Sequence, residues 1–313
     1  MELPPWFKRF MSPDADRSAE LVNALDARGI AHGVVELSGG RFIVVWPPRL
    51  MRDKHYRMKI VTAHHDRVRG TPGALDNSAA CLQLVNFLCS DREAFNTLVV
   101  FTDREELGPG SSTTILSSAT ESVQTEILPS DQGSYALGKA FAGMLGDSLG
   151  LTMPMAFPLD VTGHGDALVL SRAAENLRRR GKGDDSTSGS LQDLVAETKT
   201  MAAEVSRMMS ARAPVYMATV PFGEDLGFML AGIPALTITI MPRKEAQALA
   251  NMGGLPPWAT LSTPGERMPQ TWKALHGPDD TVSLYTDDAF LVADRLLTRL
   301  ASLRMPVSVL WPD

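Results

Sequence analysis

The chain has 313 residues, of which 44% are hydrophobic and 21% are charged. This composition is typical of a folded globular protein and excludes a disordered chain. The net charge of −6, without a long basic run, excludes nucleic acid as a partner. Because α/β proteins of this length commonly form one core, we predict a single domain over residues 1–313.

Two further features bear on the location of the protein. The longest uncharged run, Leu226 to Pro242, is shorter than the roughly 20 apolar residues that cross a bilayer, so we predict no membrane partner and a loop that leads into a buried strand. The N-terminal residues lack the basic and apolar regions of a secretory signal. Cys81 and Cys89 lie about 12 Å apart on one predicted helix, too far for a disulfide. We therefore predict buried free thiols and a cytoplasmic location.

The first third of the chain alternates between helical and extended patterns. An amphipathic pattern predicts a helix over residues 13–28, with Pro13 in its first turn. Apolar segments on both sides of residues 38–40 (Ser-Gly-Gly) predict a β-hairpin. Residues 59–62 and 97–101 are short apolar runs typical of a central sheet, and a predicted helix at about 77–88 separates them.

The rest of the chain continues this alternation. Helices are predicted at about 133–147, 190–212, 243–251 and 284–303, and strands at 155–159, 215–220 and 235–240. The pattern predicts an α/β fold, a three-layer α/β/α sandwich with a central mixed, mostly parallel sheet. A polar, glycine-rich stretch at about 173–190 predicts a mobile surface loop.

Acidic and histidine side chains follow several of the predicted strands. In open α/β sheets, functional residues gather at the carboxyl ends of strands. Carboxylate oxygens and imidazole nitrogens are ligands for divalent metals, zinc included. A pair of metals needs one shared ligand and two more for each ion. The candidate residues are His64, Asp66, Asp76, Glu105, Glu106, Asp160 and His276.

Each of these patterns also has a simpler interpretation. A single His-x-Asp after a strand is more often a hydrogen-bonded pair in a loop, and paired acids at a strand end are often just solvated. Asp76 before Asn77 also fits a helix N-cap. The combination, in chain order and at element ends, favours a metal site.

At these residues the sequence resembles the co-catalytic zinc aminopeptidases of the bacterial secreted type, a family that also includes glutamate carboxypeptidases and glutaminyl cyclases. The resemblance implies the zinc-exopeptidase fold for the whole catalytic domain. The matching segments are His64-His65-Asp66, Gly73-Ala74-Leu75-Asp76-Asn77, Glu105-Glu106-Leu107-Gly108, Asp160, and His276 with Asp280-Thr281.

The resemblance implies two divalent metal ions, with zinc as the expected metal. Asp76 would bridge the ions. His64 and Asp160 would bind one ion, and Glu106 and His276 would bind the other. The implied activity is metal-dependent hydrolysis by an aminopeptidase that acts on peptide or aminoacyl-amide substrates.

Two acids are expected to act without binding metal. Glu105 would be the general base that passes a proton from water to the leaving amine, and Asp66 would orient His64. The resemblance also implies a cis peptide bond between Asp76 and Asn77.

Some positions depart from the family pattern. Many members carry Ser-Asp-His where this chain has Gly223-Glu224-Asp225, and a glycine is common at the position of Arg104. Either Arg104 or Arg67 would favour acidic substrates if it reached the cleft, although a solvated arginine is the simpler expectation. Of the other histidines, His65 is expected to point away from the metals, and His164 either lines the mouth of the site or is structural.

Three functions stay open at this stage. The first is the aminopeptidase. The second is a glutaminyl-cyclase-like transferase with a single zinc ion and Glu105 as proton shuttle. The third is a non-catalytic binding protein on the same fold. The long segment between Asp160 and His276 leaves room for a lid or a homo-oligomer contact.

Overall fold

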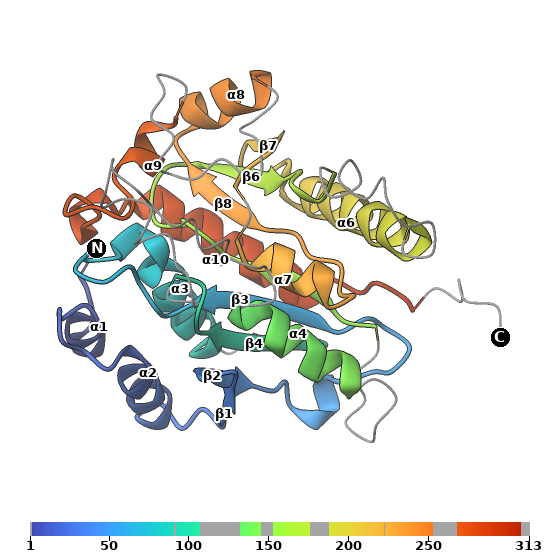
Figure 1. The fold of residues 1–313 in the computed structure, drawn as a ribbon, viewed down its shortest axis with the longest axis horizontal. Coiled ribbons are helices and arrows are strands. Elements are labelled where there is room, and N and C mark those ends of the chain that lie inside the picture. The colour runs from blue at the N-terminus through green and yellow to red at the C-terminus, as the bar shows by residue number, and fades with distance from the viewer. Residues whose placement is uncertain are drawn as a thin grey trace, which may run out of the picture.

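The computed structural model describes residues 2–90, 92–106, 132–144, 153–175, 188–221, 223–252 and 268–307 (Figure 1). Its strands form a five-stranded sheet in the order β1-β2-β4-β3-β5 and a three-stranded sheet in the order β7-β6-β8. Isolated parallel bridges from Ala156 to Ala235 and from Leu159 to Ile238 join the two at β5 and β8. The strands are β1 (Gly33–Leu37), β2 (Gly40–Val45), β3 (Lys59–His64), β4 (Thr97–Thr102), β5 (Met155–Pro158), β6 (Ala167–Ser171), β7 (Val215–Ala218) and β8 (Ile238–Met241).

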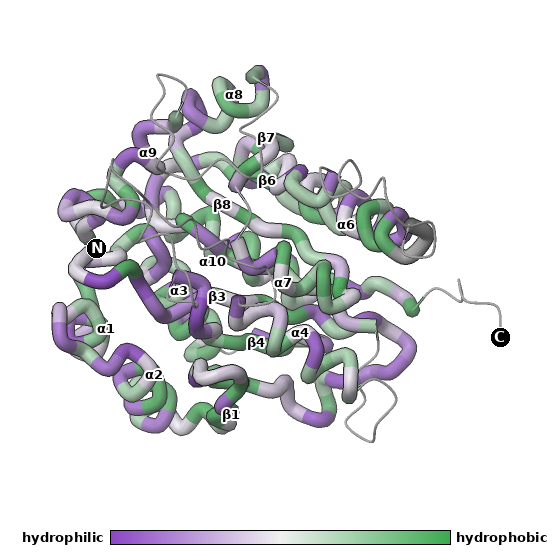
Figure 2. Tube along the Cα trace, viewed as in Figure 1, coloured by the Kyte–Doolittle hydropathy of each residue, from purple (hydrophilic) through white to green (hydrophobic). Residues whose placement is uncertain are grey.

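The sheet is mixed, as the sequence predicts. β3 pairs in parallel with both β4 and β5, and β6 pairs in parallel with β7. The β1–β2, β2–β4 and β6–β8 pairs are antiparallel. β3 and β4 are buried along their whole length, because helices cover both faces. Figure 2 shows the central strands as mainly hydrophobic.

Helices pack on both faces of the sheet and complete the predicted three-layer sandwich (Figure 1). One hydrophobic core joins α1, α2, α3, α10 and much of α6 to one face, and α4 and α7 contribute to a second core on the other. The helices are α1 (Pro5–Phe10), α2 (Arg17–Asp26), α3 (Ala79–Leu88), α4 (Gly133–Gly143), α6 (Ser188–Met209), α7 (Glu224–Leu230), α8 (Arg243–Asn251), α9 (Gln270–Lys273) and α10 (Asp287–Ser302).

The structure corrects several predictions from the sequence. The uncharged run that starts at Leu226 is not a loop at its beginning, because it continues α7 to Leu230. Two acids in the first turn of α7 favour that helix through its dipole. The predicted helix over 13–28 starts only at residue 17, because Asp16 caps it by accepting a hydrogen bond from Ala19 N.

The sequence did not predict every element, and one predicted loop lies largely outside the residues that the structure describes. α1 and β6 were not predicted, and Cys89 is exposed, whereas both thiols were expected to be buried. Most of the predicted loop at about 173–190 lies outside the described residues. Within the described residues, no helix is both long enough and apolar enough to cross a membrane.

Candidate metal centre

Three neighbouring strands bring the candidate residues to one edge of the sheet. β3 ends at His64, which pairs in register with Thr102 at the end of β4. Glu105 and Glu106 follow β4, and Asp160 follows β5 on the other side of β3. Because these strands are parallel, their carboxyl ends meet at the same place.

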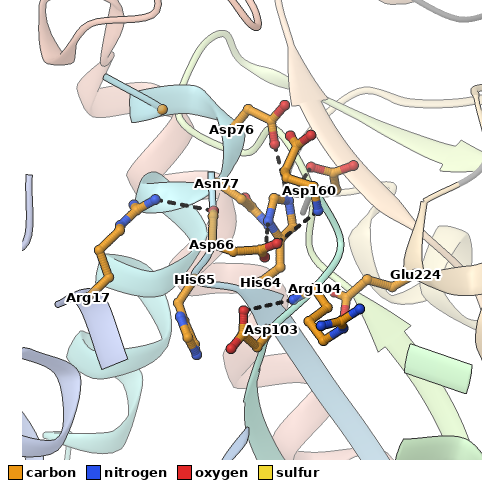
Figure 3. A network of polar contacts seen from close by, with 12 residues as sticks. Arg17, His64, His65, Asp66, Asp76, Asn77, Asp103, Arg104, Asp160 and Glu224 are labelled. Atoms are coloured by element: carbon orange, nitrogen blue, oxygen red, sulfur yellow. Dashed lines mark hydrogen bonds and ion pairs between the residues drawn. The ribbon is translucent and has the colours of Figure 1, made fainter. Parts of the chain in front are cut away.

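Asp76 lies between the two histidines. Its Oδ1 is 3.1 Å from His64 Nε2, and its Oδ2 is 3.0 Å from His276 Nε2. Each histidine also has an acid of its own: Asp160 Oδ1 is 3.8 Å from His64 Nε2, and Glu106 Oε1 is 2.9 Å from His276 Nε2. The two carboxylate oxygens of Asp76 thus face two separate His–acid pairs, and Figure 3 shows Asp76 and Asp160 beside His64.

The donor atoms fit metal ions better than they fit one another. His64 is 1% exposed, and although its Nε2 lies 3.1 Å from Asp76 Oδ1, neither His64 Nε2 nor Asp160 Oδ1 has a partner in hydrogen-bonding geometry among the described residues. Buried polar atoms without partners are costly in a protein interior. Donor atoms of His64, Asp76 and Glu106 all lie within 4.8 Å of one another. The set of imidazole nitrogens and carboxylate oxygens matches the ligands that zinc prefers.

Asp66 contacts the ring of His64 and the backbone of Glu106. Its Oδ1 is 3.3 Å from His64 Nδ1, and its Oδ2 accepts a hydrogen bond from Glu106 N at 2.8 Å. An acid on the distal nitrogen of a histidine fixes the ring so that the other nitrogen can bind a metal. The contact with Glu106 N also ties the segment after β4 to the segment after β3.

The segment around Asp76 is held by buried hydrogen bonds. The peptide bond between Asp76 and Asn77 is cis, as expected. Asp280, which is 0% exposed, accepts from Leu75 N at 2.6 Å and from Asp76 N at 3.3 Å. Asn77 Nδ2 donates to Leu159 O at 2.7 Å, one residue before Asp160. These bonds connect Asp76 to the segments that carry Asp160 and His276.

Glu105 lies on the same side as Asp160. A Cβ added at Gly223 would be 3.5 Å from Glu105 Oε1 and 3.4 Å from Asp160 Oδ2, so Gly223 lies against both carboxylates. Burial and the nearby charge of Glu106 raise the pKa of Glu105 well above its usual value. Burial and the charge of Asp76 likewise raise the pKa of Glu106 to about 8. The site therefore crowds acids that a bound cation would stabilise in their ionised form.

The remaining predicted residues face other parts of the molecule. His65 is buried and points away from His64, with Nε2 2.9 Å from Arg41 O (Figure 3). His164 Nδ1 is 2.7 Å from Leu284 O, which favours the structural alternative for this residue. In the described part of the chain, the hydrogen bonds of Arg67 go to backbone carbonyls, among them Ser12 O and Pro13 O at 2.7 Å each.

Arg104 packs against the β1–β2 hairpin. Its side chain leaves no room for a Cβ at Gly40, which would lie 2.8 Å from Arg104 Cδ. The backbone of Arg104 is left-handed, with φ of 65°. This conformation favours glycine and gives a physical reason for the glycine that is common at this position in the family.

Sequence reasoning missed a buried acid beneath the site. Glu224 is 4% exposed, and its Oε2 accepts from Thr62 Oγ1 at 2.9 Å, two residues before His64. Burial raises its pKa to about 7. The departure of residues 223–225 from the family pattern marked this position as unusual. Nothing in the sequence around Glu224 indicated that its side chain would be buried.

No protein-family model matches the sequence, and neither does any curated protein. Solved structures do match the fold. A glutaminyl cyclase from Porphyromonas gingivalis aligns over 95% of both chains, with 12% identity and a TM-score of 0.57. The LapA aminopeptidase of Legionella pneumophila aligns over 95% of this chain and 68% of its own, with 11% identity and a TM-score of 0.53.

Another match covers only part of the other protein. A zinc aminopeptidase from Bacillus subtilis aligns over 84% of this chain at 16% identity, with a TM-score of 0.48, and this chain spans about half of its length. At these identities the comparisons establish the architecture alone. The chain has the α/β fold of the LapA aminopeptidase and of the Porphyromonas gingivalis glutaminyl cyclase.

Proposed function

We propose that the protein is a zinc-dependent hydrolase that removes N-terminal residues from peptides. The observation that carries this proposal is the position of Asp76, whose two oxygens lie 3.1 Å from His64 Nε2 and 3.0 Å from His276 Nε2. In the proposed centre, Asp76 would be shared between two ions. His64 and Asp160 would hold the first ion, and Glu106 and His276 would hold the second.

The residues of the chain divide the proposed reaction between them. Bound zinc would supply an acidified water and polarise the scissile carbonyl. Glu105 would remove a proton from the attacking water and deliver it to the leaving amine. Burial and the charge of Glu106 raise the pKa of Glu105 well above its usual value, and a nearby cation would lower it. Asp66 holds the ring of His64 in place through Nδ1.

The glutaminyl-cyclase-like transferase is the second candidate, favoured by the alignment over 95% of both chains with the Porphyromonas gingivalis enzyme. It would need one zinc ion, with Glu105 as the proton shuttle. The Asp76 geometry favours two ions, since the bridging carboxylate would otherwise have one unused oxygen. A non-catalytic protein on this fold would bind metal without turnover.

One experiment separates these functions. The protein is stripped with a chelator, titrated with zinc or cobalt, and analysed for metal content while a panel of aminoacyl and dipeptide substrates and an N-terminal glutamine peptide are assayed. We expect activity on aminoacyl substrates to disappear with the metals and return at two ions per chain. Cyclisation of the glutamine peptide at one ion per chain would favour the transferase, and full activity without metal would refute both.

A further inference from the structure

Arg17 is a buried cation on the side of the metal centre that faces the N-terminal helices (Figure 3). It is the first residue of α2, yet it is only 6% exposed. Its guanidinium carbon lies 4.1 Å from the ring centroid of Phe10, a fully buried residue of α1. Arginines are rarely buried unless they have partners, so the contacts of this side chain require an explanation.

The guanidinium contacts two segments that are far apart in the sequence. Nη1 donates to the carbonyl of Asp66 at 3.2 Å, and Nη2 donates to Ser78 Oγ. Asp66 lies two residues after His64, and Ser78 lies two residues after Asp76. Arg17 therefore joins the segment of the first histidine ligand to the segment of the bridging carboxylate.

The charge of Arg17 also suits its position. Burial lowers the pKa of Arg17 to about 10, so the side chain stays protonated at neutral pH. None of the five matched sequence segments includes Arg17.

We propose that Arg17 is a positioning residue of the metal centre, whose planar fork holds the Asp66 and Ser78 segments at the spacing that two metal ions need. This inference rests on the metal centre of the proposed function. Lysine does not reproduce this arrangement, because its ammonium is a single nitrogen on a flexible stem and lacks the rigid, planar pair of donor nitrogens of the guanidinium. Loss of such supporting contacts typically costs about 10- to 100-fold in metal affinity.

Arg67 provides a matched control. It is also an arginine that ties the N-terminal region to the segment after β3, through Ser12 O and Pro13 O. Its hydrogen bonds to these carbonyls, and to Pro72 O in its own loop, use acceptors other than the two that Arg17 contacts. Replacing Arg67 removes contacts of the same N-terminal region but keeps the hydrogen bonds of Arg17 to Asp66 and Ser78.

The test measures zinc affinity by competition with a chromophoric chelator for wild type, R17M, R17K, R67M, S78A and the double variant R17K/S78A. We expect both Arg17 variants to lose about 10- to 100-fold in affinity and R67M to stay close to wild type. Because Ser78 is one of the two acceptors, S78A should add little to R17K in the double variant. Circular dichroism confirms folding, and R17K keeps the test informative if R17M does not fold.

A second measurement does not need metal. In chelated protein, hydrogen exchange at residues 64–66 and 74–78 should accelerate in R17K and not in R67M. Equal losses of zinc affinity in the Arg17 and Arg67 variants, or unchanged affinity in R17K, would overturn the positioning role. If the wild-type protein itself binds no zinc, the proposed function fails, whereas unchanged exchange in R17K defeats the inference separately.

Discussion

The two ends of β3 bury ionisable side chains in different ways. At the carboxyl end, His64 is 1% exposed and has three carboxylates within 4 Å of its ring nitrogens. At the amino end, Lys59 is fully buried, and its ammonium donates to the carbonyl of Leu303. No carboxylate of the described residues pairs with Lys59, and Arg304 adds a like charge nearby.

The difference shows which buried charges indicate function. Burial lowers the pKa of Lys59 to about 7, so this end of the strand accommodates the side chain by releasing its proton. The carboxyl end instead collects acids whose oxygens point toward shared positions, an arrangement that bound cations would stabilise. Burial alone therefore does not identify a site, whereas convergence of ligand atoms does.

The largest expected effect separates the two neighbouring acids after β4. Glu105→Gln should reduce kcat by about 10²- to 10⁴-fold, because it removes the general base. Its zinc content should stay at the wild-type value, since Glu105 is not among the proposed ligands. Glu106→Gln is the matched control and should lose metal, because Glu106 is a proposed ligand beside His276.

Steady-state kinetics and metal analysis on the same preparations test this prediction. The assignment of Glu105 fails if Glu105→Gln retains most of the activity. It also fails if this variant loses zinc as readily as Glu106→Gln, because Glu105 would then be a ligand.

A smaller effect is expected behind the bridging carboxylate. Asp280→Asn leaves one backbone N–H of Leu75 or Asp76 facing an amide donor, because asparagine has only one acceptor oxygen. We expect a loss of about 10- to 100-fold in zinc affinity and a cost of about 1–3 kcal/mol in unfolding free energy. Zinc titration and urea unfolding measure the two effects.

Asp279→Asn provides the control, because Asp279 is the exposed neighbour of Asp280. It should match wild type in both measurements. Equal zinc affinity in the Asp280 variant and wild type would mean that Asp280 does not position Asp76.

The sequence predicted the elements whose patterns are local. The hairpin around residues 38–40 and the strands β3 and β4 follow from apolar runs and glycine turns, and the structure confirms them. β6 was missed because Ala167–Ser171 is short and follows a glycine-containing segment. α7 was missed because an uncharged run was given more weight than the acids at its start.

In the candidate site, too, the sequence predicted the residues in local motifs and missed the contacts between distant residues. Four of the proposed ligands were found because they lie at or just after the end of a strand or in the first turn of a helix, and His276 was found through the Asp280-Thr281 motif that follows it. Arg17 and Asp280 were not assigned supporting contacts, because they bond to residues 49 and 205 positions away, in part through backbone atoms. Backbone acceptors and donors occur at nearly every residue, so the sequence carries no signal for which of them a side chain will reach.

The last prediction concerns stability at the other end of β3. The folded-state pKa of Lys59 is lowered from 10.5 to about 7, so between these values the unfolded chain binds a proton that the folded chain does not. Stability should therefore rise with pH across this window, by at most about 1.4 kcal/mol per pH unit from this group. Below about pH 7 the buried ammonium is retained, and its destabilising effect is fully present.

Lys59→Met should remove this contribution, because methionine fills a similar volume without a charge. Urea unfolding from pH 6 to 10 measures the difference between variant and wild type, in which the pH dependence of the metal centre cancels. The exposed Lys54→Met variant should keep the wild-type slope, since its side chain is already in water. If Lys59→Met keeps that slope as well, the ammonium is not released on folding, and the contrast between the two ends of β3 rests on geometry alone.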